Sequence, residues 1–154
     1  MNIKFIIMNR IKTLLILLAL CLNISLLQAQ ISHPKREFRG AWIQCVNGQF
    51  QGMSVQAMKK NLINQLNVMQ KAGINAVIFQ VRAECDALYK SNYEPWSRFL
   101  TGTQGLPPSP SWDPLKFMID ECHKRGMELH AWINPYRACT KSTTSLSPKH
   151  PYNK

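Results

Sequence analysis

The sequence predicts an α/β fold in which parallel strands alternate with helices in the order βαβαβ. Short apolar runs at 38–46, 74–82 and 127–134 have the composition of strands, and the second is as continuously apolar as a strand buried on both faces. The two segments between these runs repeat apolar residues at helical spacing. The connections from helix to strand are short and those from strand to helix are longer, which favours right-handed crossovers and a parallel sheet.

The first helix is predicted from its start, its apolar stripe and its end. Asn47-Gly48 ends the first strand, and Ser54 stands where an N-cap is expected. Gly73 lies just past the last turn. The stripe between these two signals consists of Val55, Met58, Leu62, Leu66 and Met69.

The second helix and the third strand have equally clear limits. Asp113-Pro114 supplies an N-cap and a first-turn proline, the helix ends at Lys124-Arg125-Gly126, and Pro135 ends the strand that follows. Between the second strand and this helix, residues 83–112 are rich in Pro, Gly, Ser and aromatic residues and have no strong periodicity. Connections of this length in compact domains are usually functional, so we expect this one to contribute to a site.

A secretory signal peptide is predicted at 1–29. A basic head around Arg10 and Lys12 precedes an apolar run at 13–22, and Ala29 provides the small residue at the cleavage site. The run is shorter than the ~20 residues needed to cross a bilayer, so we expect an exported protein, periplasmic or extracellular, with no stable membrane span after cleavage. Lipid attachment at Cys21 is disfavoured because bulky leucines precede it, and 30–36 is expected to be a polar lead-in.

The composition is that of one globular domain, and its charge does not indicate a nucleic-acid-binding protein. The 154 residues have a formal net charge of +11, and removal of the signal segment with its three basic residues leaves 16 basic against 8 acidic residues. The basic residues are spread over helix faces and tails, so we expect a solvated surface. No phosphate-binding glycine pattern follows the first strand, and we expect no cofactor.

Four cysteines follow the signal segment, and none has the spacing of a metal clamp: Cys45, Cys85, Cys122 and Cys139. Export permits disulfides, and Cys45 and Cys85 lie near the ends of neighbouring predicted strands. The sequence leaves open whether these two form a bridge or, as we favour, remain separate buried thiols.

Several blocks, in order along the chain, resemble the glycosyl-hydrolase-like 10 family. The blocks are Arg39-Gly40-Ala41-Trp42, the run from Phe79 to Tyr89, Glu94-Pro95-Trp96-Ser97 with Leu100-Thr101-Gly102, and the run from His130 to Arg137, so the resemblance covers about 36–137. It implies a partial (β/α)8 TIM-type barrel, here its first βαβαβ units, at 37–137. It also implies a bacterial glycan, such as peptidoglycan glycan strands, as substrate. Cys85 stands where a small residue such as Gly is more usual.

The acidic residues expected at the catalytic face lie in the connection after the second strand: Glu84, Asp86 and Glu94. Chemistry in such folds gathers at the C-terminal ends of the strands, and glycosidases use a pair of carboxylates. We predict Asp86 as the catalytic candidate. It lies four residues past Arg82, and a pair between them would either hold a sugar hydroxyl or fix the loop.

The predicted substrate-binding residues are Arg82, Trp96, Trp132, Asn134, Tyr136 and Arg137. Trp132 and Asn134 alternate with His130 along the third strand and share its inward face, where His130 is expected to be a core residue. Residues 138–154 are expected to be an unstructured or truncated tail. The predicted function is therefore that of a glycoside hydrolase of the cell envelope, present as an N-terminal fragment; the alternatives are a non-catalytic glycan-binding protein and an inactive truncated product.

Overall fold

A computed structural model describes residues 3–27, 37–140 and 145–153, which form two units, Met1–Glu37 and Phe38–Lys154. The first unit holds the helix α1 (Ile3–Leu27), which contains the apolar run of the predicted signal segment. No helix among the described residues is long and apolar enough to cross a membrane. The expected cleavage site at Ala29 lies outside the described residues, so the signal peptide stays a prediction.

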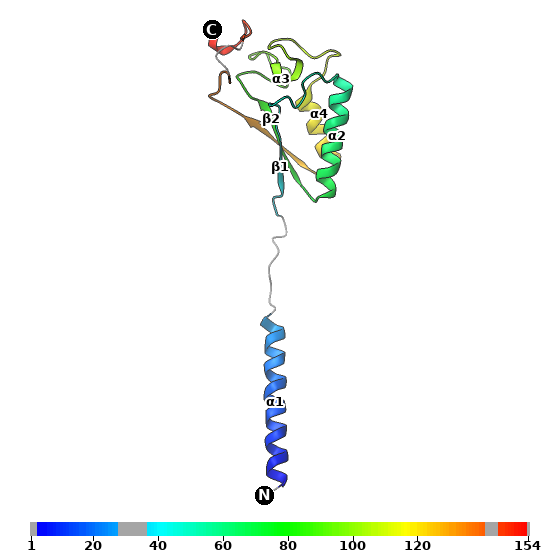
Figure 1. Ribbon diagram of the computed structural model, residues 1–154, viewed down its shortest axis with the longest axis vertical. Coiled ribbons are helices and arrows are strands. Elements are labelled where there is room, and N and C mark those ends of the chain that lie inside the picture. The colour runs from blue at the N-terminus through cyan, green and yellow to red at the C-terminus, as the bar shows by residue number, and fades with distance from the viewer. Residues whose placement is uncertain (1–2, 28–36, 141–144, 154) are drawn as a thin grey trace. The chain divides into compact units, whose positions relative to one another are not determined.

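The second unit is an α/β structure with a three-stranded parallel sheet, as expected for part of a TIM-type barrel. The strands β1 (Gly40–Ile43), β2 (Ala76–Arg82) and β3 (Glu128–Ile133) follow one another in the sheet (Figure 1). The helices α2 (Val55–Lys71) and α4 (Pro114–His123) connect them. Both predicted caps are present, since Ser54 accepts a hydrogen bond from the Ala57 amide and Asp113 accepts one from the Lys116 amide.

The strand β1 is shorter than the apolar run at 38–46 predicts. Beyond Ile43 the chain leaves the backbone ladder, and the Cys45 amide donates to the side-chain Oε1 of Gln80 at 3.1 Å. A side chain of β2 thus replaces a backbone partner, and the end of β1 is free to turn away. Asn47, with φ of 59°, and Gly48, with φ of 73°, complete this turn in the left-handed region.

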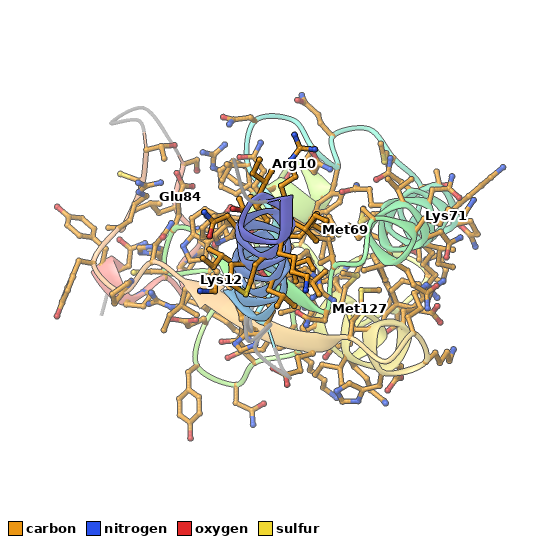
Figure 2. The ribbon with its side chains drawn as sticks, turned by 90° about the horizontal axis from the view of Figure 1, so that it is seen from below. Arg10, Lys12, Met69, Lys71, Glu84 and Met127 are labelled. Carbon is orange, nitrogen blue, oxygen red and sulfur yellow. The ribbon has the colours of Figure 1, made fainter. Side chains whose placement is uncertain are left out.

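The core lies between the sheet and the two helices. Ile43, Phe79 and Val81 point from the sheet toward buried residues of the helices such as Leu66 and Met118. Figure 2 shows Met69 on the sheet side of α2, whereas Lys71 points outward from its last turn. The apolar stripe predicted for α2 therefore faces the sheet, with Val55, Met58, Leu62 and Leu66 buried.

The other face of the sheet is open. Trp42 has an exposed fraction of 70%, and Phe38 packs its ring edge-on against His130 with a centroid distance of 5.5 Å. His130, expected as a core residue, is exposed and lies 3.2 Å from an oxygen of Glu128. This face carries the residues that alternate with the helix-facing ones, which is the inward face of a barrel.

The connection after β2 has more structure than the sequence predicts. It contains the short helix α3 (Arg98–Thr101), which Ser97 caps and which ends at Gly102 in the left-handed conformation. An isolated parallel bridge joins Ala87 to Trp96 and closes the loop between them. Because α3 has four residues, it leaves no periodic signal in the sequence.

The C-terminal segment also differs from the expected unstructured tail. Residues 145–153 are ordered by turns and by the short 3-10 helix η1 (Pro151–Asn153). His150 is fully buried; its Nε2 lies 3.0 Å from the Glu84 carbonyl, and its Nδ1 accepts a hydrogen bond from the Tyr152 amide. The Nδ1 contact makes Nε2 the protonated nitrogen, which donates to Glu84. A polar sequence without an apolar stripe is held here by hydrogen bonds.

Candidate functional site at the C-terminal edge of the sheet

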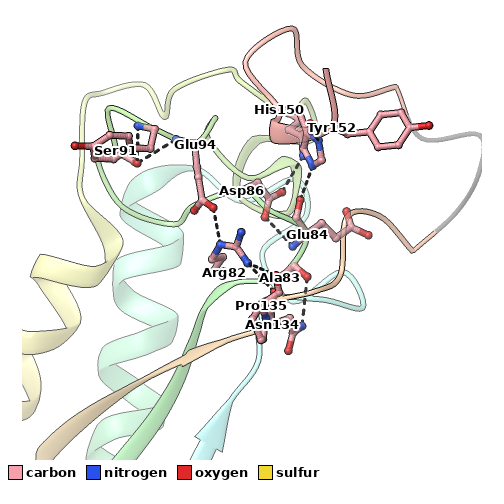
Figure 3. A network of polar contacts seen from close by, with 12 residues as sticks. Arg82, Ala83, Glu84, Asp86, Ser91, Glu94, Asn134, Pro135, His150 and Tyr152 are labelled. Atoms are coloured by element: carbon pink, nitrogen blue, oxygen red, sulfur yellow. Dashed lines mark hydrogen bonds and ion pairs between the residues drawn. The ribbon is translucent and has the colours of Figure 1, made fainter. Parts of the chain in front are cut away.

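Arg82, the last residue of β2, joins three segments at the C-terminal edge of the sheet. Its Nε donates to Oε1 of Glu94 at 2.6 Å, and its Nη1 donates to the backbone carbonyl of Asn134 at 2.7 Å (Figure 3). Glu94 is placed by Ser91, whose hydroxyl accepts hydrogen bonds from the amides of Tyr93 and Glu94. The hydrogen bond and charge of Glu94 outweigh the effect of burial and raise the pKa of Arg82. Arg82 is therefore a charged bridge between the ends of two strands and the long loop.

The hypothetical pair between Arg82 and Asp86 does not form. Asp86 is fully buried, and its two oxygens accept hydrogen bonds from the Glu84 amide at 3.1 Å and from Nε2 of Gln104 at 3.3 Å. The cause is Cys85, whose φ of 51° reverses the chain and turns Asp86 back onto the loop. In this arrangement Asp86 orders the turn after β2, and its catalytic role stays a prediction.

Glu84 forms a second, deeper ion pair that sequence reasoning did not identify. Its side chain has no exposed surface, and both its oxygens accept hydrogen bonds from Arg98, at 2.8 Å from Nε and 3.1 Å from Nη2. Burial alone would raise the pKa of Glu84, but hydrogen bonds from Arg98 and Thr140 outweigh it and hold the pKa below its ordinary value. Fourteen residues separate the partners, a spacing that no local pattern indicates.

Among the three loop carboxylates, Glu94 has surface that a ligand can contact. The exposed fraction of its side chain is 13%, whereas Glu84 and Asp86 are fully buried. Glu94 also lies beside Arg82, a predicted substrate-binding residue. It is therefore the carboxylate best placed to meet a sugar.

The residues predicted at and after the end of the third strand lie at this edge. Nε1 of Trp132 donates to Oδ1 of Asn134 at 3.0 Å, and Nδ2 of Asn134 donates to the Ala83 carbonyl at 3.3 Å, so both side chains are fixed beside the end of β2. Tyr136 is 97% exposed and Arg137 is exposed, which leaves both available to a ligand. Trp96 is different, because it is partly buried and its ring packs against the core.

Two hollows adjoin these residues. One, of about 450 Å³, is lined by Trp42, Ile43, Gln44, Gln49, Gln65 and Trp132, and so joins the inward face of the sheet to its β1 edge. The other, of about 550 Å³, lies between the loop after β1, α3 and the segment after β3. Aromatic rings and amides of this kind suit the apolar faces and hydroxyls of sugars.

Cys45, Cys85, Cys122 and Cys139 are free thiols in the structure, and no group of three or more possible metal-binding side chains occurs among the described residues. Cys45 is buried, and burial, with a smaller effect of Asp86, raises its pKa to about 12. Cys122 is also buried, and its pKa is raised to about 11 for the same main reason. These two thiols behave as small core residues. Cys45 and Cys85 are separate thiols, as the sequence favours, but Cys85 is only half-buried.

Comparison with known proteins identifies the family. Residues 37–154 match the model of the family described as Glycosyl hydrolase-like 10. The chain belongs to this family. Glycosyl hydrolase YngK of Bacillus subtilis (strain 168) is 46% identical over 125 residues, which cover 77% of this chain and 24% of that protein. Glycosyl hydrolase DigH of Escherichia coli (strain K12) is 48% identical over 82 residues, which cover 53% of this chain and 18% of that protein.

The chain thus spans about a quarter of the length of YngK and less than a fifth of DigH in these matches. The match confirms the predicted family. The residues that build the site at the C-terminal edge, from Arg82 to Arg137, all lie inside the matched segment.

Proposed function

We propose that this protein is an exported glycoside hydrolase that acts on bacterial envelope glycan, with peptidoglycan glycan strands as its substrate. The observation that carries the proposal is the cluster at the C-terminal edge of the sheet, where Arg82, Glu94 and Asn134 are locked together beside Trp132. A charged carboxylate, an amide and an indole are the groups that orient a sugar ring and act on its glycosidic bond. Membership of a glycosyl-hydrolase-like family supports the same class of reaction.

Within this proposal Glu94 is the carboxylate that contacts the sugar. Arg82 fixes its orientation through the 2.6 Å contact, and Ser91 fixes the backbone on which it stands. Glycosidases act through two carboxylates about 5 to 10 Å apart, so Glu94 supplies one member of such a pair. Asp86 supports the turn that carries Glu84 and the following loop.

The test is cleavage of purified, peptide-free glycan strands, with new reducing ends measured by chromatography and mass spectrometry. We expect Glu94→Gln to lower the rate at least about a hundredfold, the usual scale for loss of an acid or base group. Glu128→Gln is the matched control, because Glu128 is an exposed carboxylate at the opposite end of β3. Equal rates for the two variants would remove Glu94 from the chemistry.

A non-catalytic glycan-binding protein is the second candidate. It is favoured by the state of the loop carboxylates, since Glu84 and Asp86 are buried and Glu94 is held in an ion pair. Binding of glycan strands to the purified protein without any new reducing ends would establish this candidate in place of the first.

A further inference from the structure

The 550 Å³ hollow at the C-terminal edge is positively charged on its surface. Its lining includes Asn47 and Gln51 from the loop after β1, Arg98 and Phe99 from α3, and Arg137 and Thr140 from the segment after β3. Two arginines thus line the hollow, and no acidic residue belongs to its described lining. Three segments far apart in the sequence build it.

Arg98 is held in place but keeps free hydrogen-bonding capacity. Its Nε and Nη2 are occupied by Glu84, and Nη2 also donates to the Thr140 hydroxyl at 3.0 Å. Its Nη1 makes no hydrogen bond to any described residue. The guanidinium lies over the Phe99 ring, 4.2 Å from its centroid, so its plane is fixed by packing as well.

Arg137 is the second cation, and no described residue compensates its charge. It forms no hydrogen bond or ion pair within the described part of the chain. The nearest negative charge to Arg98 is that of Glu84, which has no exposed surface and lies behind Arg98. Among the described residues, the charges that line the hollow are therefore those of the two arginines.

We propose that this hollow is a subsite for a carboxylate-bearing sugar. A carboxylate accepts paired hydrogen bonds from guanidinium donors, which are the strong, charge-assisted kind. Nη1 of Arg98 and the side chain of Arg137 supply these donors, and Asn47 and Gln51 supply amides for ring hydroxyls. The proposal rests on the proposed function and deepens it, because it places the recognition of a carboxylate of the glycan at named residues, Arg98 and Arg137.

Two pairs of sugars that differ by a carboxylate test the subsite. Glucuronic acid is compared with glucose, and N-acetylmuramic acid with N-acetylglucosamine, by NMR titration of the purified protein at low salt. We expect each acid to bind about tenfold more tightly than its neutral counterpart, the effect of one partly exposed charge-assisted hydrogen bond. The protein's larger preference shows which carboxylate the subsite binds: that on the ring carbon of glucuronic acid or that on the lactyl ether of N-acetylmuramic acid.

Arg137→Met is expected to abolish the preference for acids, so that each acid binds no more tightly than its neutral counterpart. Lys71→Met is the matched control, because it removes the same charge from the last turn of α2 at the other end of the sheet and is expected to retain the preference. Acidic and neutral sugars bound equally by the unaltered protein, or a preference that survives Arg137→Met, would overturn the subsite. Sugar binding and glycan-strand cleavage are measured in separate assays. The proposed function is therefore tested by the appearance of reducing ends, whatever the binding preference.

Discussion

Replacing Arg98 with methionine is expected to destabilise the protein by about 3 kcal/mol. The side chain of Glu84 has no exposed surface, and Arg98 is the partner of both its oxygens. Removing one member of a buried pair typically costs about 3 to 5 kcal/mol, because the remaining charge stays buried without a counterion. Arg98 itself is 26% exposed, so water entering its place is expected to keep the loss near the lower end.

The double variant Glu84→Gln with Arg98→Met separates the buried charge from the lost packing. With both charges removed, no ion remains uncompensated, and we expect the loss to fall to about 1 kcal/mol. Adding Glu84→Gln to Arg98→Met is thus expected to restore about 2 kcal/mol, which is the part of the loss that is due to the uncompensated buried charge. Lys116→Met is the control, since its pair with Asp120 has exposed fractions of 74% and 50% and is expected to contribute less than about 0.5 kcal/mol.

The effect of Arg98→Met on the free energy of unfolding is expected to depend on pH. The pKa of Glu84 is lowered in the folded protein, so its pair contributes stability above the ordinary value of 4.5 and loses it as the pH falls through the folded value. Without Arg98, burial dominates and the pKa of Glu84 is expected to rise, so acid neutralises the buried charge. The gap in stability between the unaltered protein and Arg98→Met should therefore narrow on going from pH 7 to pH 4.

Urea unfolding followed by circular dichroism and tryptophan fluorescence measures each free energy of unfolding. A loss below about 1 kcal/mol for Arg98→Met at pH 7, or a gap that widens in acid, would refute the assignment of Glu84 as a buried anion that depends on Arg98.

Two further predictions concern the cysteines. A thiol reagent at pH 8 is expected to modify the exposed Cys139 rapidly in the native protein and to modify Cys45 and Cys122 only on unfolding. The reason is that these two thiols are buried, and burial raises the pKa of Cys45 to about 12 and that of Cys122 to about 11. Mass spectrometry of samples taken at successive times measures the order of modification. Cys85→Gly is expected to raise the free energy of unfolding by up to about 1 kcal/mol, because φ of 51° disfavours a side chain, whereas Cys85→Ala keeps that strain; equal stabilities of the two variants would contradict a strained Cys85.

The parts of the fold predicted correctly are those governed by local signals. Ser54 and Asp113 cap α2 and α4 as their positions in the sequence indicate, and the run ending at Arg82 forms the central strand. These features depend on short-range chemistry, namely a cap oxygen reaching nearby amides and apolar residues at a regular spacing. The same holds for bringing Trp132 and Asn134 to the site, since alternation along a strand fixes their common face.

Local signals did not predict which charged residues pair with one another. The spacing suggested that Arg82 pairs with Asp86, but Cys85 between them has a left-handed conformation that redirects the chain. The partner of Arg82 is instead Glu94. Glu94 lies in a loop that the bridge between Ala87 and Trp96 closes. That bridge is a tertiary contact with no local pattern. It also places Trp96, a predicted substrate-binding residue, partly buried against the core.

Glu84 has a consequence for how motion is distributed in this part of the molecule. Its carboxylate is bound by Arg98, which also holds Thr140, and its carbonyl is bound by His150. Opening the contact of Glu84 with Arg98 or that with His150 leaves a buried polar group without a partner, so the three segments have little freedom to open one at a time. Their amides should exchange hydrogen with solvent as a single cooperative unit, and a ligand that protects one of them from exchange should protect all three.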